Sequence, residues 1–268
     1  MNHSHFYPQR TDAAEASEPR QKLLELTKEH RFATTHQLAR FLRPSYRSER
    51  SALRQTLRHL AALQQDGLVS SLERRVGGWQ GGSSVGIWTL TSRGHRHLTG
   101  SRKRLRPHHL STHFLEHSLA VTETCVRLQE ATRQLADYEV VVQQEPACWR
   151  SYLGSHGERV TLRPDLYAQV SSTDYEDRYF LEVDRSSENP GRVIRKCWQY
   201  EHHRRSGAEQ KRAGVYPAVV WLVPSEHRKQ QLLRHLTQEP KLPQHLFVVI
   251  TPDELTALIR DGPPSAAN

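Results

Sequence analysis

The stretch that decides the fold is residues 160–185, which reads VTLRPDLYAQVSSTDYEDRYFLEVDR. Residues 160–170 and 177–185 are rich in apolar, β-branched and aromatic side chains, which favours two β-strands, and the polar segment SSTDYED between them favours a turn. Asp165 and Glu182 are separated by 16 residues, enough for a strand, the turn and part of the next strand. The pattern therefore predicts two paired strands that each carry an acidic residue.

Three carboxylates are expected to meet on one face of this strand pair. Glu182 and Asp184 lie two residues apart, so they share one face of a strand, and antiparallel pairing can bring Asp165 beside them. Three converging carboxylates repel one another strongly unless a cation neutralises them. The sequence therefore predicts that Asp165, Glu182 and Asp184 bind Mg²⁺ or Mn²⁺.

The rest of the C-terminal half alternates helical and strand patterns around this pair. The expected helices are residues 111–136, 190–206, 226–238 and 252–259, and the expected strands are residues 138–146, 160–170, 177–185, 218–224 and 245–250. Helices that alternate with strands in this order predict an α/β domain around a five-stranded mixed sheet. The fold class is thus α/β overall.

The N-terminal part has a different order, with three helical patterns before a β-hairpin. Helices are expected from Pro19, from Thr34 or Thr35 to Pro44, and in residues 48–66, where Leu53, Leu57, Leu60 and Leu63 form an apolar face. Strands at residues 68–76 and 87–91 flank a glycine-rich tip. This order predicts a winged helix-turn-helix domain, whose third helix enters the major groove of DNA.

The charge distribution favours DNA as the partner of this N-terminal part. Residues 1–110 hold 19 Lys and Arg against 8 Asp and Glu, a surplus of +11, whereas residues 111–268 hold 19 against 21. A concentrated positive charge attracts the phosphates of double-stranded DNA, although a winged helix also serves as a protein-docking module. The predicted DNA-binding residues are Arg47, Arg50, Arg54, Arg58, Arg74, Arg75, Arg102, Lys103 and Arg104.

Composition also sets the expected domain limits and compartment. The predicted divisions are a disordered tail at residues 1–17, the winged helix at 18–100, a basic linker at 101–110, the α/β domain at 111–261 and a disordered tail at 262–268. No apolar run is long enough to cross a membrane, and the first 20 residues lack a signal-peptide core. The three cysteines, Cys125, Cys148 and Cys197, have no zinc-site spacing. We therefore expect a cytoplasmic protein with reduced, buried thiols.

The Pro164-Asp165 pair followed by Glu182-x-Asp184 resembles the PD-(D/E)xK, or restriction-endonuclease-like, nuclease fold. More narrowly, RPD, then FLEVDRSSE, then a basic helix with Lys196 and Tyr200, all behind a winged helix, resembles the replication-relaxation family of bacterial plasmids and other mobile elements. The resemblance covers roughly residues 20–255, and its specific part is residues 163–165 and 180–200. It implies a metal-dependent endonuclease that nicks DNA during plasmid replication or mobilisation.

The resemblance also implies roles for individual residues. In the nuclease fold an aspartate and a glutamate hold the metal, and a lysine in the third position helps to orient water. Here Asp184 stands in that third position, so the lysine role passes to Lys196 on the following helix, or to Arg185. Glu116 is a candidate for a further metal-site carboxylate from the first helix of the domain.

Several alternatives remain open at this point. Tyr200 is either a relaxase-like nucleophile or a packing residue against the sheet. The acidic strand rim is either a metal site or a set of ion pairs with Arg163, Arg185 and Arg192, which would leave a non-catalytic DNA-binding regulator on an inactive nuclease scaffold. No nucleotide-binding motif occurs, so no nucleotide cofactor is expected. Other candidate partners are a second copy of the chain and other replication or mobilisation proteins.

Overall fold

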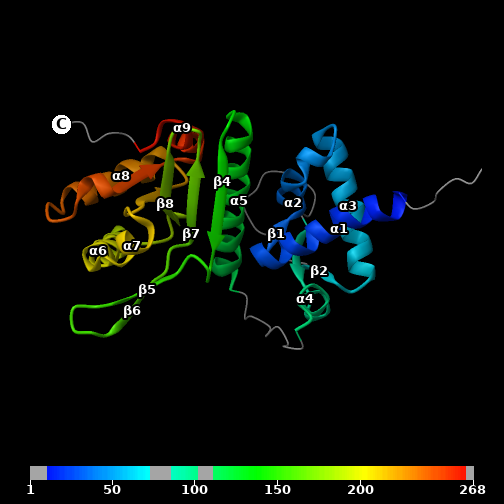
Figure 1. Cartoon of the computed structure of the whole chain (residues 1–268), viewed down its shortest axis with the longest axis horizontal. Helices are drawn as coiled ribbons and strands as arrows, with labels where there is room; N and C mark the ends of the chain where they lie inside the picture. The colour runs from blue at the N-terminus through cyan, green and yellow to red at the C-terminus, as the bar shows by residue number, and fades with distance from the viewer. Residues whose placement is uncertain (1–10, 73–85, 102–110, 264–268) are drawn as a thin grey trace, which may run out of the picture. The chain divides into compact units, whose positions relative to one another are not determined.

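The computed structural model describes residues 11–72, 86–101 and 111–263, and side chains from residue 18 onwards in the first helix. Its described part is α/β, with nine α-helices and a five-stranded mixed sheet (Figure 1). Contacts divide the chain into two compact units, Met1–Thr122 and Glu123–Asn268. Each unit is described separately below.

The first unit is a set of helices with a small antiparallel sheet. Its elements are α1 (Thr11–His30), β1 (Ala33–Thr34), α2 (Thr35–Phe41), a 3₁₀ turn (Arg43–Ser45), α3 (Glu49–Gln65), β2 (Val69–Leu72), β3 (Ile87–Leu90), α4 (Ser92–Thr99) and the start of α5 (Thr112–Gln134). The three strands lie in the order β1-β3-β2. The Thr34 side chain accepts the Gln37 N–H, and the Gln37 side chain accepts the Thr34 N–H, so a reciprocal cap fixes the start of α2.

Two expectations for this unit differ from the structure. α1 begins at Thr11, upstream of Pro19 and within the segment expected to be a tail. Leu57 is exposed, whereas the buried face of α3 is made of Ala52, Thr56, His59, Leu60 and Leu63. The apolar stripe was therefore misplaced at Leu57, because the small and polar residues Ala52, Thr56 and His59 occupy buried positions that a count of leucines does not reveal.

The start of α5 belongs to the first unit. Thr122 Oγ1 donates to the Phe32 carbonyl at 3.0 Å, and Gln37 Nε2 donates to the Leu119 carbonyl at 3.0 Å. The boundary between the units thus falls within α5. Residues 102–110, most of the expected basic linker, lie outside the described residues.

The second unit is built on the five-stranded sheet. Its strands are β4 (Glu139–Gln144), β7 (Leu166–Ser171), β8 (Glu176–Val183), β9 (Ala218–Leu222) and β10 (Phe247–Ile250). They lie in the order β10-β9-β8-β7-β4, with β4, β7 and β8 antiparallel and β8, β9 and β10 parallel. The expected five-stranded mixed sheet is confirmed.

Helices after β8 make the parallel crossovers. They are α6 (Pro190–Ser206) and α7 (Ala208–Ala213) between β8 and β9, and α8 (Glu226–Thr237) between β9 and β10, whereas α9 (Leu255–Asp261) follows the last strand. α6 and α8 pack on the face of the sheet that carries Phe180 and Trp221, in one continuous apolar cluster. Figure 1 shows α6, α7 and α8 on the side of the sheet away from α5. The sheet therefore presents β8 directly beneath α6.

The strand expected at residues 160–170 is two strands in two different sheets. β6 (Arg159–Leu162) pairs with β5 (Arg150–Leu153) in a hairpin, whereas β7 begins at Leu166 and joins the main sheet. Pro164 stands at the break, where it has no N–H to give to a ladder. β5 was not predicted from the sequence.

The expectations of buried, reduced thiols and of no membrane-spanning apolar segment agree with the structure. All three cysteines are buried and free of disulfides. Within the described ranges, none of the helices has the length and apolar character needed to span a bilayer.

Gly94 allows α4 to pack closely against the chain before β2. A Cβ at this position would lie 2.1 Å from the Leu68 carbonyl oxygen. This oxygen belongs to the backbone, so relief of the clash would require a backbone shift. We expect Gly94→Ala to destabilise the protein by about 1–3 kcal/mol despite the better helix propensity of alanine. Gly191→Ala is the matched control, since its nearest contact would be at 3.4 Å. Equal urea midpoints for the two variants would contradict this packing argument.

Candidate active site

The antiparallel register of β7 and β8 brings Asp165 beside Glu182. Leu166 faces Leu181 in the ladder. Asp165, which directly precedes β7, therefore lies beside Glu182, which follows Leu181 in β8. Asp165 Oδ2 accepts a hydrogen bond from the Val183 N–H at 2.8 Å. The structure thus confirms the expected proximity of Asp165 to the acidic end of β8.

Glu182 is the buried centre of the site. It is 1% exposed and points from β8 towards α6. Its Oε2 pairs with Lys196 Nζ, and its Oε1 accepts a hydrogen bond from the Tyr200 hydroxyl. Lys196 and Tyr200 are four residues apart, so they lie on the same face of α6. The prediction that Lys196 points back at the carboxylates is confirmed.

Burial controls the electrostatics of this group. Loss of water raises the pKa of Glu182 to about 8, although Lys196 opposes the shift. Burial alone would lower the pKa of the Lys196 ammonium, but Glu182 and Asp165 raise it above its ordinary value. Lys196 therefore keeps its proton. Its side chain is 27% exposed, so the ammonium lies at the border between the buried carboxylate and solvent.

Tyr200 is a buried hydrogen-bond donor. Its side chain is fully buried, and burial together with Glu182 raises the pKa of the phenol well above its ordinary value. A nucleophile must reach its substrate, and this hydroxyl is enclosed between Glu182 and the core cluster that contains Phe180. The geometry favours the packing interpretation of Tyr200 over the covalent one.

Asp184 does not join Asp165 and Glu182. It follows the end of β8, and its carboxylate forms two contacts with Arg228 of α8, at 2.6 Å and 3.2 Å. Arg228 is itself buried and also donates to the Glu188 carbonyl at 2.7 Å. Arg228 was not predicted from the sequence, because it lies 44 residues from Asp184 on a helix with no motif of its own.

The other residues predicted for the site have different surroundings. Arg163 stacks over the Trp149 ring at 4.8 Å, and Arg192 pairs with Glu188 at 3.6 Å on α6. Arg185 is half-buried just after Asp184. Glu116 lies on α5, in the part of that helix that belongs to the first unit. Glu182 and Asp184 thus pair with Lys196 and Arg228, whereas Arg163 and Arg192 contact Trp149 and Glu188.

A divalent cation fits only part of the predicted ligand set. Mg²⁺ in proteins is commonly held by one or two carboxylates, with water and phosphate oxygens completing its shell. Asp165 and Glu182 are adjacent carboxylates, and one oxygen of Glu182 faces the partly exposed Lys196 while the other accepts from Tyr200. Both oxygens of Asp184 are held by the buried Arg228. In the described part of the chain there is no group of three or more His, Cys, Asp or Glu arranged to hold a metal. Of the three predicted carboxylates, Asp165 and Glu182 therefore lie together and Asp184 lies with Arg228.

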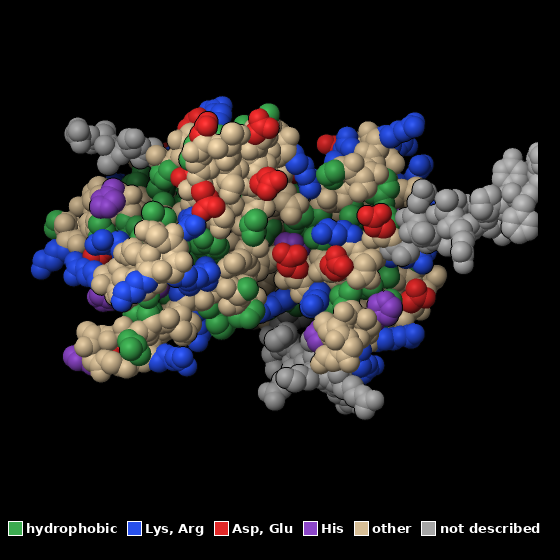
Figure 2. Space-filling model, in the orientation of Figure 1, with side chains coloured by type: hydrophobic (Ala, Val, Ile, Leu, Met, Phe, Trp, Pro, Cys, Tyr) green, Lys and Arg blue, Asp and Glu red, His purple; other side chains and the backbone are tan. Residues whose placement is uncertain are grey.

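The predicted DNA-binding residues in the described part are solvent-facing. Arg47, Arg50, Arg54 and Arg58 are all exposed around the start and along the outer face of α3. Figure 2 shows Lys and Arg side chains over the region of α1 and α3. Arg74, Arg75, Arg102, Lys103 and Arg104 lie outside the described residues.

The Glu182–Lys196 pair predicts a pH-dependent stability. Glu182 has a raised pKa, so the folded chain keeps a proton that the unfolded chain releases above its ordinary pKa of 4.5, and stability falls as pH rises towards 8. In Lys196→Met the buried carboxylate loses its cation. The variant should lose little free energy of unfolding at about pH 5, where Glu182 is neutral, and about 3 kcal/mol at about pH 9, where Glu182 is ionised.

Urea denaturation at both pH values measures this difference. Arg192→Met on the exposed side of α6 is the control, with little effect at either pH. If Lys196→Met lost the same free energy of unfolding at both pH values, Glu182 and Lys196 would have no stabilising charge interaction.

Comparisons with known proteins agree with the motif. The model of the replication-relaxation family matches residues 24–219, which include α2, α3 and α4 of the first unit and the Asp165–Glu182–Lys196 group. No curated protein and no solved structure matched the chain. The family indicates a role in the replication or relaxation of plasmid or other mobile-element DNA. Because the match spans well over half of the sequence, the chain belongs to the replication-relaxation family.

Proposed function

We propose that this protein binds double-stranded DNA in plasmid or mobile-element replication, and that its first unit is a winged helix-turn-helix domain. The order α1-β1-α2-α3-β2-β3-α4, with β1 added to the β2–β3 hairpin, supports this assignment. In such domains the third helix enters the major groove. Here the third helix is α3.

The observation that carries the proposal is the division of α3 into two faces. One face is buried on Leu60 and Leu63, whereas Arg50, Arg54 and Arg58 recur every four residues on the exposed face. Guanidinium groups bind phosphate oxygens and the edges of guanine. The surplus of +11 in residues 1–110 gives the same part of the chain a positive field.

A second proposed activity is strand nicking by the second unit. The order α5-β4-β7-β8-α6-β9 supports a nuclease-like fold, and Lys196 reaches Glu182 from the helix after the acidic strand. Asp165 and Glu182 would hold Mg²⁺ or Mn²⁺, which would polarise a scissile phosphate and lower the pKa of bound water. Asp184 has no place in this proposal.

The residues of this group have separate parts in the proposed nicking activity. Tyr200 orients the Glu182 carboxylate through its hydroxyl. Lys196 keeps a proton at Nζ and is partly exposed, so it is placed to contact a phosphate oxygen that approaches Glu182. Arg228, in the first turn of α8, holds Asp184 and thereby the end of β8 in position.

The first experiment tests DNA binding by α3. We expect Arg54→Gln/Arg58→Gln to weaken binding to a DNA duplex and to lower the slope of log affinity against log salt by about 2, since each lost phosphate contact contributes about 0.9. Lys22→Gln/Lys28→Gln removes two exposed charges from α1 and is the control. An unchanged slope for the α3 variant, measured by fluorescence anisotropy, would exclude α3 as the DNA-contacting helix.

The second experiment tests nicking of supercoiled plasmid that carries the native origin region. Wild type with Mg²⁺ or Mn²⁺ should yield nicked circles, and EDTA should prevent them. Glu182→Gln and Asp165→Asn should abolish the product, whereas Glu188→Gln, a nearby partly exposed carboxylate, should retain it. Intact plasmid in every reaction, together with a mobility shift, would instead establish a non-catalytic regulator on a nuclease-like scaffold.

A further inference from the structure

The solvent face of α6 carries a row of basic and polar side chains. Arg192, Arg195, Gln199, His202 and Arg205 are all exposed and recur every three or four residues, so they form one stripe along the helix. The opposite face is buried through Val193, Cys197 and Tyr200 in the core cluster. We call the exposed stripe the α6 basic face.

Charge gathers on this part of an otherwise acidic unit. Residues 190–213, which form α6 and α7, hold 7 Lys and Arg against 2 Glu, a net of +5. Residues 123–268 hold 19 against 20 in all, so the remainder of that unit carries 12 against 18, a net of −6. The positive charge is therefore local to these two helices.

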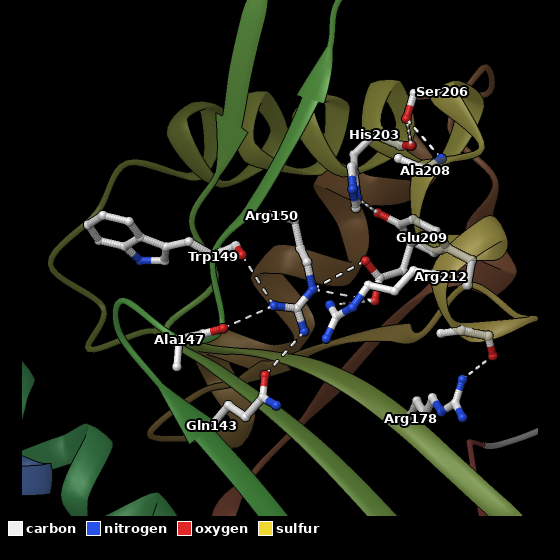
Figure 3. Close-up of polar contacts among 12 residues, drawn as sticks. Gln143, Ala147, Trp149, Arg150, Arg178, His203, Ser206, Ala208, Glu209 and Arg212 are labelled. Atoms are coloured by element: carbon white, nitrogen blue, oxygen red, sulfur yellow. Dashed lines mark hydrogen bonds and ion pairs between the residues drawn. The ribbon is translucent and has the colours of Figure 1, made fainter.

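Two buried carboxylates fix the arginines at the end of the face. Glu201, which is 1% exposed, accepts from Arg204 Nε at 2.7 Å and from Arg205 Nε at 2.5 Å. Glu209 of α7, also buried, pairs with Arg150 at 3.2 Å and Arg212 at 3.4 Å. Figure 3 shows Arg150 and Arg212 directed at Glu209 from the hairpin side and from α7.

Each of these carboxylates thus meets two guanidinium groups, which leaves an excess of positive charge. Arg205 and Arg212 are 60% and 50% exposed, so each is held by a buried acid yet presents donors to solvent. A guanidinium whose rotamer is already fixed loses less entropy when it binds an anion. Arg205 of α6 and Arg212 of α7 are therefore held in place by buried acids and remain accessible to an anion.

The other end of the face lies beside the candidate active site. An open hollow of about 480 Å³ is lined by Ser187, Glu188, Asn189, Gly191, Arg192 and Arg195. Lys196, the partner of Glu182, follows Arg195 directly.

We propose that the α6 basic face is a second DNA-binding surface, separate from α3, which holds the phosphate backbone of the duplex along the second unit. From Arg192 to Arg205 the helix rises about 20 Å, which spans several phosphates of one strand. This inference rests on the proposal that the protein binds DNA and does not depend on nicking. It accounts for the net charge of +5 on α6 and α7 in a unit whose remainder carries −6.

The test is the salt dependence of binding to a random-sequence DNA duplex by the full-length protein. Arg192→Gln/Arg195→Gln should lower the slope of log affinity against log salt by about 2. The matched control is Arg234→Gln/Lys241→Gln, which removes two exposed charges elsewhere in the same unit and should leave the slope unchanged. Circular dichroism of each variant verifies that its fold is retained.

The outcomes separate this inference from the proposed function. A slope for the α6 variant equal to that of the control, with a reduced slope for Arg54→Gln/Arg58→Gln, would overturn the α6 surface and leave DNA binding by α3 intact. Absence of salt-dependent binding by the wild type would overturn both. Reduced slopes for both the α3 and the α6 variants would support two surfaces.

Discussion

The carboxylate of Glu182 sets the arrangement of the second unit. A carboxylate that is 1% exposed needs charged or hydrogen-bonding partners, because desolvation of an unpaired charge costs several kcal/mol. Lys196 and Tyr200 supply those partners from α6, and this requirement fixes both the rotation of the helix and its distance from β8. With that face of α6 turned inward, Arg192, Arg195 and Arg205 face solvent.

Cations have two distinct uses in this chain. Lys196, Arg228 and Arg150 neutralise buried acids and connect strands with helices or the hairpin with α7. The arginines of α3 and of the α6 basic face remain exposed, where they attract polyanions without a desolvation cost. A total charge of +9 does not distinguish the two groups, because it counts the cations that pair with buried acids together with those exposed to solvent.

The departure from the nuclease motif has a physical explanation. Asp184 stands where a lysine is expected, and it holds the end of β8 to α8 through Arg228. A lysine at that position would lie against a buried guanidinium, and like charges in such a place repel. The positive charge next to Glu182 therefore comes from α6, which leaves Asp165, Glu182 and Lys196 as the candidate group.

The sequence by itself determined the five-stranded mixed sheet (although not where β7 begins), α6 at residues 190–206 and the meeting of Asp165, Glu182 and Lys196. These features depend on local periodicity and on pairing between neighbouring strands, which short-range patterns encode. Tertiary structure alone decided the pairing of Asp184 with Arg228, the exposure of Leu57, and the separation of β6 from β7 at Pro164. Each of these features depends on contacts between residues that are far apart in the sequence. Helical or strand periodicity is a local property, so it does not predict such contacts.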